Sequence, residues 1–292
     1  MASEHAHLEQ EIRKLASFVP ISATVANIIR YELKGEAANR RLRSHIEADN
    51  AITVMVLQAA NSSFYGFRGQ VVTVAHAVML IGFEEISRIV LMHELRQRII
   101  ALNPAQQESV KRLWIHSITT ATLSRILCRE LGLHTSGEEF TGGLLHDLGK
   151  LFFIQNVPDL AGRIAQRIAE GTDDVEAERE IARWPHTDIG ALLGLQWDLP
   201  PVLCDVMKLH HLSDPLEEGQ SIVAVIRLAD LFCEKWGYGI GEGNAPDRIS
   251  EDPCWDHLRR SVAGLNGRTA EEIEGVVKPE FDTHTEFREL FH

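Results

Sequence analysis

The side chains best suited to bind metal ions are far apart along this chain, and their separation constrains the fold more than any other feature. Adjacent His146 and Asp147 stand in the segment Leu-Leu-His-Asp-Leu-Gly-Lys, residues 144–150. Together with further histidines and one aspartate they form the series H, HD, H, HH, D, made of His116, His146, Asp147, His186, His210, His211 and Asp230. A shared metal centre therefore requires a fold that brings several distant segments to one point.

Helical periodicity offers such a fold. Apolar residues recur at helical spacing along most of the chain, and no sustained alternation of apolar and polar residues marks a strand. A long amphipathic run from about residue 106 to 131 carries His116, and a second predicted helix, 140–154, carries the HD pair. Two antiparallel helices of this length can bring His116 to His146. We therefore predict an all-α protein.

Composition limits the classes of function. The 292 residues are 45% hydrophobic, which is enough for a substantial core. A net charge of −13 argues against broad nucleic-acid binding, because no basic excess exists to release phosphate counterions. No apolar run approaches the ~18 residues of a membrane span. The four cysteines form no CxxC motif, so we expect buried thiols in a cytoplasmic, reducing compartment.

The ligand types indicate the chemistry. Mixed imidazole and carboxylate ligands suit iron, manganese, zinc or nickel better than calcium, so we expect one or two divalent transition-metal ions. His146 can give a ring nitrogen to one ion while Asp147 bridges two. Two ions can activate a water for attack on a phosphoester. If hydrolysis occurs, Asp147 and Lys150 are the predicted catalytic residues, with the Lys150 ammonium one turn after His146 contacting phosphate.

Five of these residues also have a purely structural interpretation. Asp230 stands in an apolar helix, where it could cap or bridge another helix, although an unpaired buried carboxylate is costly. His186 follows Trp184-Pro185 and could be an exposed histidine at a helix start. His210 and His211 could complement a helix dipole at a C-terminus. Lys150 alone would be an ordinary surface residue.

Two family resemblances follow from these residues. The series H, HD, H, HH, D resembles the ligand series of the HD superfamily of metal-dependent phosphohydrolases. Earlier in the chain, Asn-Ser-x-x-Tyr-Gly at 61–66 and Ala-Val-x-x-Leu-Gly-like sequence at 77–82 are the most specific of several segments that resemble the HDOD domain. That domain is the HD-related output domain of bacterial signalling proteins, and the resemblance runs from about residue 14 to about 235. It implies an all-helical fold and a regulatory role.

The two resemblances imply different things about catalytic activity. Most HDOD domains have lost metal ligands, whereas the series here resembles the complete set of the HD-GYP phosphodiesterases. Leu212-Ser-Asp-Pro215 follows His211 in place of an Asp-Gly-x-Gly-Tyr-Pro segment, which argues against cyclic-di-GMP as substrate. The first interpretation is a regulatory HDOD protein with a metal site, whose partners are signalling proteins or a small phosphorylated ligand. The alternative is a metal-dependent phosphohydrolase or cyclic-nucleotide phosphodiesterase.

The predicted organisation has three parts. The break near 103–108 separates an N-terminal helical part of the HDOD resemblance, 1–103, from an HD-like metal-binding part, 104–238. A glycine-rich loop and C-terminal helices make up 239–292, without an assigned role. Because the candidate ligands all follow residue 115, we expect the N-terminal part to be a regulatory or partner surface.

Overall fold

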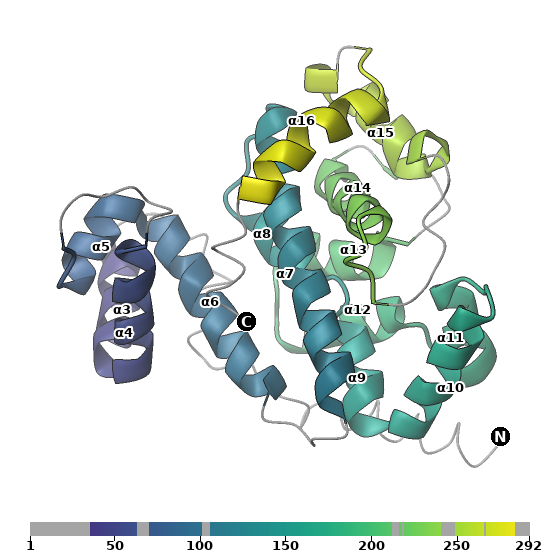
Figure 1. Ribbon diagram of the computed structural model, residues 1–292, viewed down its shortest axis with the longest axis horizontal. Coiled ribbons are helices and arrows are strands. Elements are labelled where there is room, and N and C mark those ends of the chain that lie inside the picture. Colours follow the sequence, from purple (N-terminus) through teal and green to yellow (C-terminus); the bar gives the residue numbers. More distant parts are fainter. Residues whose placement is uncertain are drawn as a thin grey trace. The chain divides into compact units, whose positions relative to one another are not determined.

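The computed structural model describes residues 36–62, 70–100, 106–211, 216–217, 219–240, 249–265 and 267–283. These residues form helices, turns and loops and contain no strand, which confirms the all-α prediction. They divide into two compact units, one within 36–100 and one within 106–281 (Figure 1). Among the described helices, none is both long enough and apolar enough to cross a membrane.

The first unit is a small helical cluster. Its apolar stripes bury Ile46, Val56 and Ile89 completely. Asn61 closes the segment between the second and third helices: its amide nitrogen donates to Val71 O at 2.8 Å, and its oxygen accepts from Val71 N at 2.8 Å. Residues 63–66 of the predicted turn lie outside the described part. The helices are α3 (Glu36–Ala48), α4 (Asn50–Ala60), α5 (Val74–Ile81) and α6 (Phe83–Ile100).

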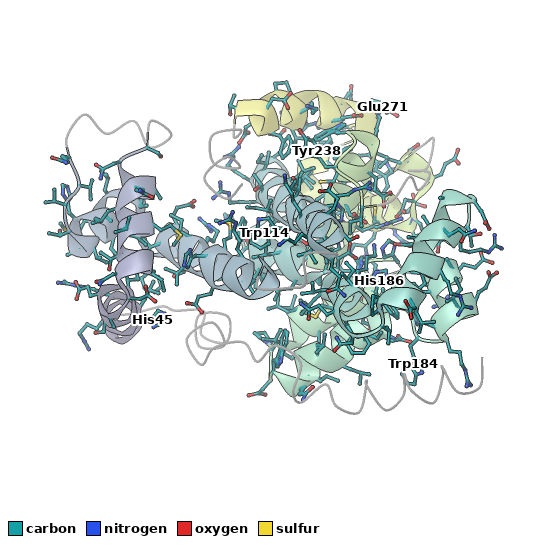
Figure 2. All side chains as sticks on the ribbon, turned by 60° about the horizontal axis from the view of Figure 1, so that its bottom comes forward. His45, Trp114, Trp184, His186, Tyr238 and Glu271 are labelled. Atoms are coloured by element: carbon teal, nitrogen blue, oxygen red, sulfur yellow. The ribbon has the colours of Figure 1, made fainter. Side chains whose placement is uncertain are left out.

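The second unit is built around the long helix α7 (Gln107–Glu130), which packs against α8 (Glu138–Leu145) and α14 (Ser221–Lys235). Trp114 of α7 and His186 of α12, which Figure 2 labels, are both buried residues of this unit. The remaining helices are α9 (Leu148–Asn156), α10 (Pro158–Ala169), α11 (Asp174–Ala182), α12 (His186–Gln196), α13 (Pro201–Leu209), α15 (Pro253–Ser261) and α16 (Ala270–Thr283), with short 3₁₀ turns at Ile249–Glu251 and Ala263–Leu265.

A close approach between α7 and α8 brings the first two histidines together. A Cβ on Gly143 would lie 2.7 Å from the Cα of Ala121, so no larger residue fits without a shift of backbone. The carbonyl of the same glycine accepts a hydrogen bond from His146 Nδ1. The prediction that the helix with His116 packs beside the segment with His146 is confirmed.

The helix that carries the HD pair differs from the sequence prediction, because it is broken in two. One continuous helix was expected over 140–154, but α8 ends at Leu145 and α9 begins at Leu148. Asp147 has φ −96° and ψ 15°, and its side chain makes no capping hydrogen bond to α9. Hydrophobic periodicity continues through the break and so conceals it. The break leaves the Asp147 carboxylate available to other side chains.

The C-terminal helices complete the core. Phe232 of α14 is fully buried with Trp255 and Leu258 of α15 and Phe281 of α16. Residues 249–283, to which the sequence assigned no role, therefore cover α7 and α14 and support the helix that carries Asp230. All four cysteines are free and buried, as expected. Residues 241–248 of the predicted glycine-rich loop lie outside the described part.

Candidate metal centre

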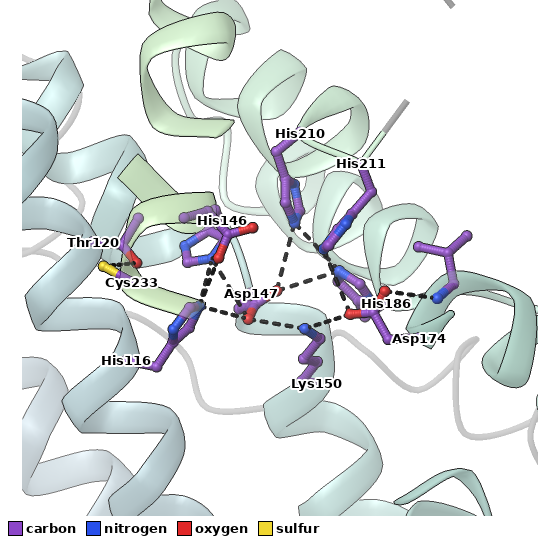
Figure 3. A network of polar contacts seen from close by, with 12 residues as sticks. His116, Thr120, His146, Asp147, Lys150, Asp174, His186, His210, His211 and Cys233 are labelled. Atoms are coloured by element: carbon purple, nitrogen blue, oxygen red, sulfur yellow. Dashed lines mark hydrogen bonds and ion pairs between the residues drawn. The ribbon is translucent and has the colours of Figure 1, made fainter. Parts of the chain in front are cut away.

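The seven predicted ligands all meet inside the second unit, and Figure 3 labels six of them, all except Asp230. In two sets of them, the candidate ligand atoms lie within 4.8 Å of one another. Asp230 adjoins the first set, with Oδ1 3.2 Å from His116 Nε2 and 3.9 Å from His146 Nε2. The first set is His116, His146 and Asp147, and the second is Asp147, His186, His210 and His211.

Asp147 belongs to both sets because its two oxygens face different histidines. Its Oδ2 lies 3.4 Å from His116 Nε2 and 3.5 Å from His146 Nε2. Its Oδ1 lies 3.2 Å from His186 Nε2 and 3.5 Å from His210 Nε2. The side chain is fully buried, and Oδ1 has no hydrogen-bond partner among the described residues. Each oxygen of Asp147 therefore faces its own pair of imidazole nitrogens.

Four of the imidazoles turn their Nε2 atoms inward because acceptors occupy the other nitrogen. Each Nδ1 lies 2.7–3.1 Å from an oxygen to which it donates, namely Tyr238 O for His116, Gly143 O for His146, Val206 O for His210 and Glu178 Oε2 for His186. In a neutral ring the proton then sits on Nδ1, and Nε2 presents a lone pair.

These lone pairs face one another at short range. His116 Nε2 and His146 Nε2 are 3.1 Å apart, and His186 Nε2 and His210 Nε2 are 3.3 Å apart. Two neutral imidazole nitrogens in this orientation repel each other unless a cation stands between them or one takes a proton. The residues therefore fit divalent metal ions, for which imidazole nitrogen and carboxylate oxygen are common ligands.

The charges of the cluster support this fit. Burial disfavours charge on His116, but hydrogen bonds to Asp147 and Asp230 prevail and raise the pKa of this imidazole to about 10. Burial lowers the pKa of His146 to about 3, against the attraction of Asp147. Burial likewise opposes ionisation of Asp147, yet Lys150 and His146 hold the pKa of that carboxyl well below its usual range. The cluster thus combines ionised carboxylates with a marked preference for a positive charge.

Comparison with known proteins identifies the family of the chain. Residues 19–213, more than half of the chain, match the model of the HDOD domain. This chain belongs to the HDOD family.

Solved structures agree with the fold of this HDOD protein. An HDOD domain protein of unknown function from Geobacter sulfurreducens has a TM-score of 0.79 and 20% identity, over 99% of this chain and 96% of that one. A Marinobacter aquaeolei VT8 structure named "Putative signal transduction protein" gives 0.69 and 19%, over 98% and 64%. A "Putative phosphohydrolase" from Shewanella amazonensis SB2B gives 0.62 and 21%, over 79% and 81%.

One curated relative also matches. An uncharacterized protein of Treponema pallidum (strain Nichols) is 22% identical over 197 residues, which is 64% of this chain and 36% of the relative. The match thus spans about a third of that protein's length.

Three side chains that the sequence did not single out surround the ligands of this HDOD chain. Glu178 Oε2 accepts from both the backbone N and the Nδ1 of His186, each at 2.7 Å. Asp174 Oδ2 lies 2.8 Å from Lys150 Nζ. Arg227 donates to Asp230 Oδ2 at 3.0 Å. Only Arg227 had a sequence signal, since it precedes Asp230 by one turn of an apolar helix.

The surroundings of Lys150 and His211 differ from those that the sequence predicts. Lys150 is not an ordinary surface residue: its side chain is 17% exposed, and its Nζ lies 3.1 Å from Asp147 Oδ2. His211 Nδ1 accepts from Arg227 at 3.2 Å, so in the neutral ring its proton sits on Nε2. That Nε2 is buried without a hydrogen-bond partner among the described residues. His211 therefore stands among the candidate ligands but is prepared differently from the other four imidazoles.

The alternative interpretation of His186 does not match its surroundings, whereas His210 does lie at the C-terminus of a helix. His186 begins α12 as predicted, but it is fully buried, so it is not an exposed helix-start residue. His210 caps α13 and is 1% exposed. Asp230 is 2% exposed and contacts His116 across helices as well as Arg227 on its own helix.

Gly149 of the HD segment has a steric role. A Cβ at this position would lie 2.0 Å from the carbonyl oxygen of His186. The absence of a side chain lets α9 touch the start of α12, which brings Asp147 and His186 to the same point. The glycine of the His-Asp-Leu-Gly-Lys segment is thus part of the construction of the centre.

The centre opens into a cavity of about 730 Å³. Its walls come from α7, α9, α10, α11 with the turn before it, and α14. The residues of the centre that line it include His116, Lys150, Asp174, His211 and Arg227. A ligand in this cavity would therefore reach both the candidate metal ligands and three cationic side chains, Arg112, Lys150 and Arg227.

Proposed function

We propose that this HDOD protein binds two divalent transition-metal ions and hydrolyses a phosphoester at the shared centre. The observation that carries the proposal is the position of Asp147, whose two buried oxygens face two separate groups of imidazole nitrogens. His116, His146, Asp147 and Asp230 would hold one ion. The second would be held by Asp147, His186, His210 and His211.

Iron, manganese, zinc and nickel suit this donor set of nitrogen and carboxylate oxygen. When bound, such a pair of ions supplies Lewis acidity and an activated water for phosphoester hydrolysis. Glu178 fixes the tautomer of His186 by accepting its Nδ1 proton, and backbone carbonyls do the same for three other histidines. The protein thus orients these imidazoles in advance, with each Nε2 directed toward the place where an ion would be held.

Other residues of the chain would handle the phosphate and the proton. Lys150 and Arg227 line the cavity and place positive charge beside the centre, where phosphate oxygens would gather. In the balanced reaction the water oxygen forms a bond to phosphorus and the P–O bond to the alcohol breaks. The alcohol oxygen leaves with a proton from the water. The absence of the Gly-Tyr-Pro segment argues against cyclic-di-GMP as the ester.

A second candidate function is regulation without catalysis, which the family itself favours. Lys150 and Arg227 already pair with carboxylates, namely Asp147 and Asp174 for the lysine and Asp230 and Asp252 for the arginine. In this view the metal centre stabilises the fold or senses a phosphorylated ligand. The unit within 36–100 would then present a surface to signalling proteins rather than to nucleic acid or a membrane.

Metal analysis and turnover separate the two candidates. Protein purified without chelator and reconstituted with manganese or iron should contain about two ions per chain, and Asp147→Asn should contain fewer. A panel of phosphomonoesters and phosphodiesters should then be hydrolysed by wild-type protein and not by Asp147→Asn. Asp188→Asn is the matched control, because Asp188 pairs with Lys208 at the surface of α12. Full metal occupancy without turnover of any ester would favour the regulatory candidate.

A further inference from the structure

The cavity beside the metal centre is much larger than a phosphate group needs. Its volume of about 730 Å³ falls in the range of about 300–1,000 Å³ that is usual for small-molecule sites. The side chains of the centre occupy only part of its lining. The residue types in the rest of the lining therefore indicate the chemistry of the part of the ligand that is not phosphate.

One side of the cavity is aliphatic. Five residues of α10, which we call the α10 strip, recur at helical spacing and line the cavity: Ala161, Gly162, Ala165, Ile168 and Ala169. Ala165 and Ala169 are exposed. Leu160, on the core side of the same helix, is buried and does not line the cavity, whereas Ile164 is buried and also contributes to the lining. The strip is therefore not needed to attach α10 to the core.

The polar residues of α10 lie elsewhere. All of α10 is described, and none of Asp159, Arg163, Gln166 and Arg167 lines the cavity. Arg167 instead pairs with Glu180 of α11 outside it. A helix that turns its charged residues away from a water-filled space and leaves small apolar residues facing it is suited to contact an apolar surface.

The lining does not favour a nucleobase. Base recognition commonly uses an aromatic face on which the base stacks. Among the described lining residues, Phe153 is the only phenyl, phenol or indole ring, and it is 3% exposed, so its face is already covered. Phe153 and Ile154 of α9 add further apolar atoms to the lining.

A second observation concerns a buried histidine of the lining. The His211 side chain is only 8% exposed, and its Nε2 lies 3.5 Å from Asp174 Oδ2 but makes no hydrogen bond among the described residues. A buried polar atom of this kind ordinarily has a partner, and a ligand or ion can supply it. The polar and apolar walls therefore belong to one binding site.

We infer that the cavity binds a phosphate ester whose non-phosphate part is an apolar alkyl or aryl group, with the phosphate at the metal centre and the apolar group along the α10 strip. This inference rests on the proposed function, which supplies the position of the phosphate. Small side chains at Ala161, Gly162 and Ala165 leave room for the apolar group. Its burial then contributes to affinity in proportion to the area removed from water.

Binding of non-hydrolysable alkylphosphonates to the metal-loaded protein tests the inference. Calorimetry with methyl-, butyl-, hexyl- and octylphosphonate should show affinity rising about two- to fourfold for each added methylene that is buried. Ala165→Gln, a polar change at an exposed position of the strip, should flatten this dependence on chain length. Gln166→Ala is the control, since it makes the reverse exchange at the adjacent position outside the cavity and should keep the dependence.

The possible outcomes are distinct. Affinity that is equal for all chain lengths, or a dependence unchanged in Ala165→Gln, would overturn the apolar-group assignment while leaving the phosphoester centre intact. Tighter binding of a nucleoside 5′-phosphonate than of any alkylphosphonate would overturn it as well. If metal-loaded protein binds no phosphonate, even methylphosphonate, the proposed phosphoester function fails and this inference fails with it.

Discussion

Gly149→Ala is the sharpest test of how the metal centre is built. An alanine Cβ would lie 2.0 Å from the His186 carbonyl oxygen, whereas ordinary contact begins at 3.4 Å. The start of α12 and the start of α9 must therefore separate by 3.4 − 2.0 = 1.4 Å. The other atoms in its way are backbone atoms of His186, at 2.7 and 2.8 Å, so no flexible side chain can yield instead.

Metal sites tolerate ligand displacements of only about 0.2 Å. The separation of 1.4 Å between α9 and α12 should disconnect His186 from Asp147 Oδ1 while leaving His116, His146 and Asp230 in place. We expect the variant to keep about one of the two ions. Overpacking of this kind costs about 1–3 kcal/mol, which corresponds to a fall in Tm of about 2–12 °C for a unit of this size.

The assay combines elemental analysis of the folded, gel-filtered variant with thermal unfolding followed by circular dichroism. Gly275→Ala is the control. It introduces the same methyl group in helix α16, where a Cβ would meet nothing within 4 Å, and should raise stability by up to about 1 kcal/mol. Wild-type metal content and Tm in Gly149→Ala would refute the steric account of this glycine.

Three further predictions follow from individual contacts. His186→Ala should lower metal content more than His211→Ala, because of these two histidines only His186 donates its Nδ1 proton to an acceptor and so keeps a lone pair on Nε2. Equal losses of metal in the two variants would contradict this difference. Glu178→Gln should weaken binding of the second ion about 10- to 100-fold, measured by chelator competition, because it weakens the acceptor that orients His186; an unchanged affinity would exclude that role. Burial, together with the charge of Asp230, raises the pKa of Glu234 in α14 from 4.5 to about 8. The folded state therefore prefers the protonated acid. The free energy of unfolding of chelator-treated protein should fall as the pH rises from about 4.5 to about 8. Glu234→Gln should therefore gain stability over wild type between pH 5 and pH 8 in urea unfolding, and a constant difference at both pH values would refute the assignment.

The sequence by itself determined the fold class and the members of the candidate centre. The 3.6-residue periodicity of apolar side chains is a local property, so it predicted helices, including the long one that became α7. The ligand candidates were also visible, because the type and order of His and Asp residues are written directly in the chain. The burial cost of an aspartate in an apolar helix marked Asp230 in the same way.

Only the tertiary structure decided how these residues are combined. The division into two sets by the oxygens of Asp147 depends on the approach of α7, α9, α12, α13 and α14, and periodicity contains no information about that approach. Glu178 and Asp174 look like ordinary residues of the charged helix α11 until its packing places them beside His186 and Lys150. The break at the HD pair and the contact of Gly149 with His186 were hidden for the same reason. Each is set by segments distant in the sequence, whose steric and electrostatic effects exist only after the chain has folded.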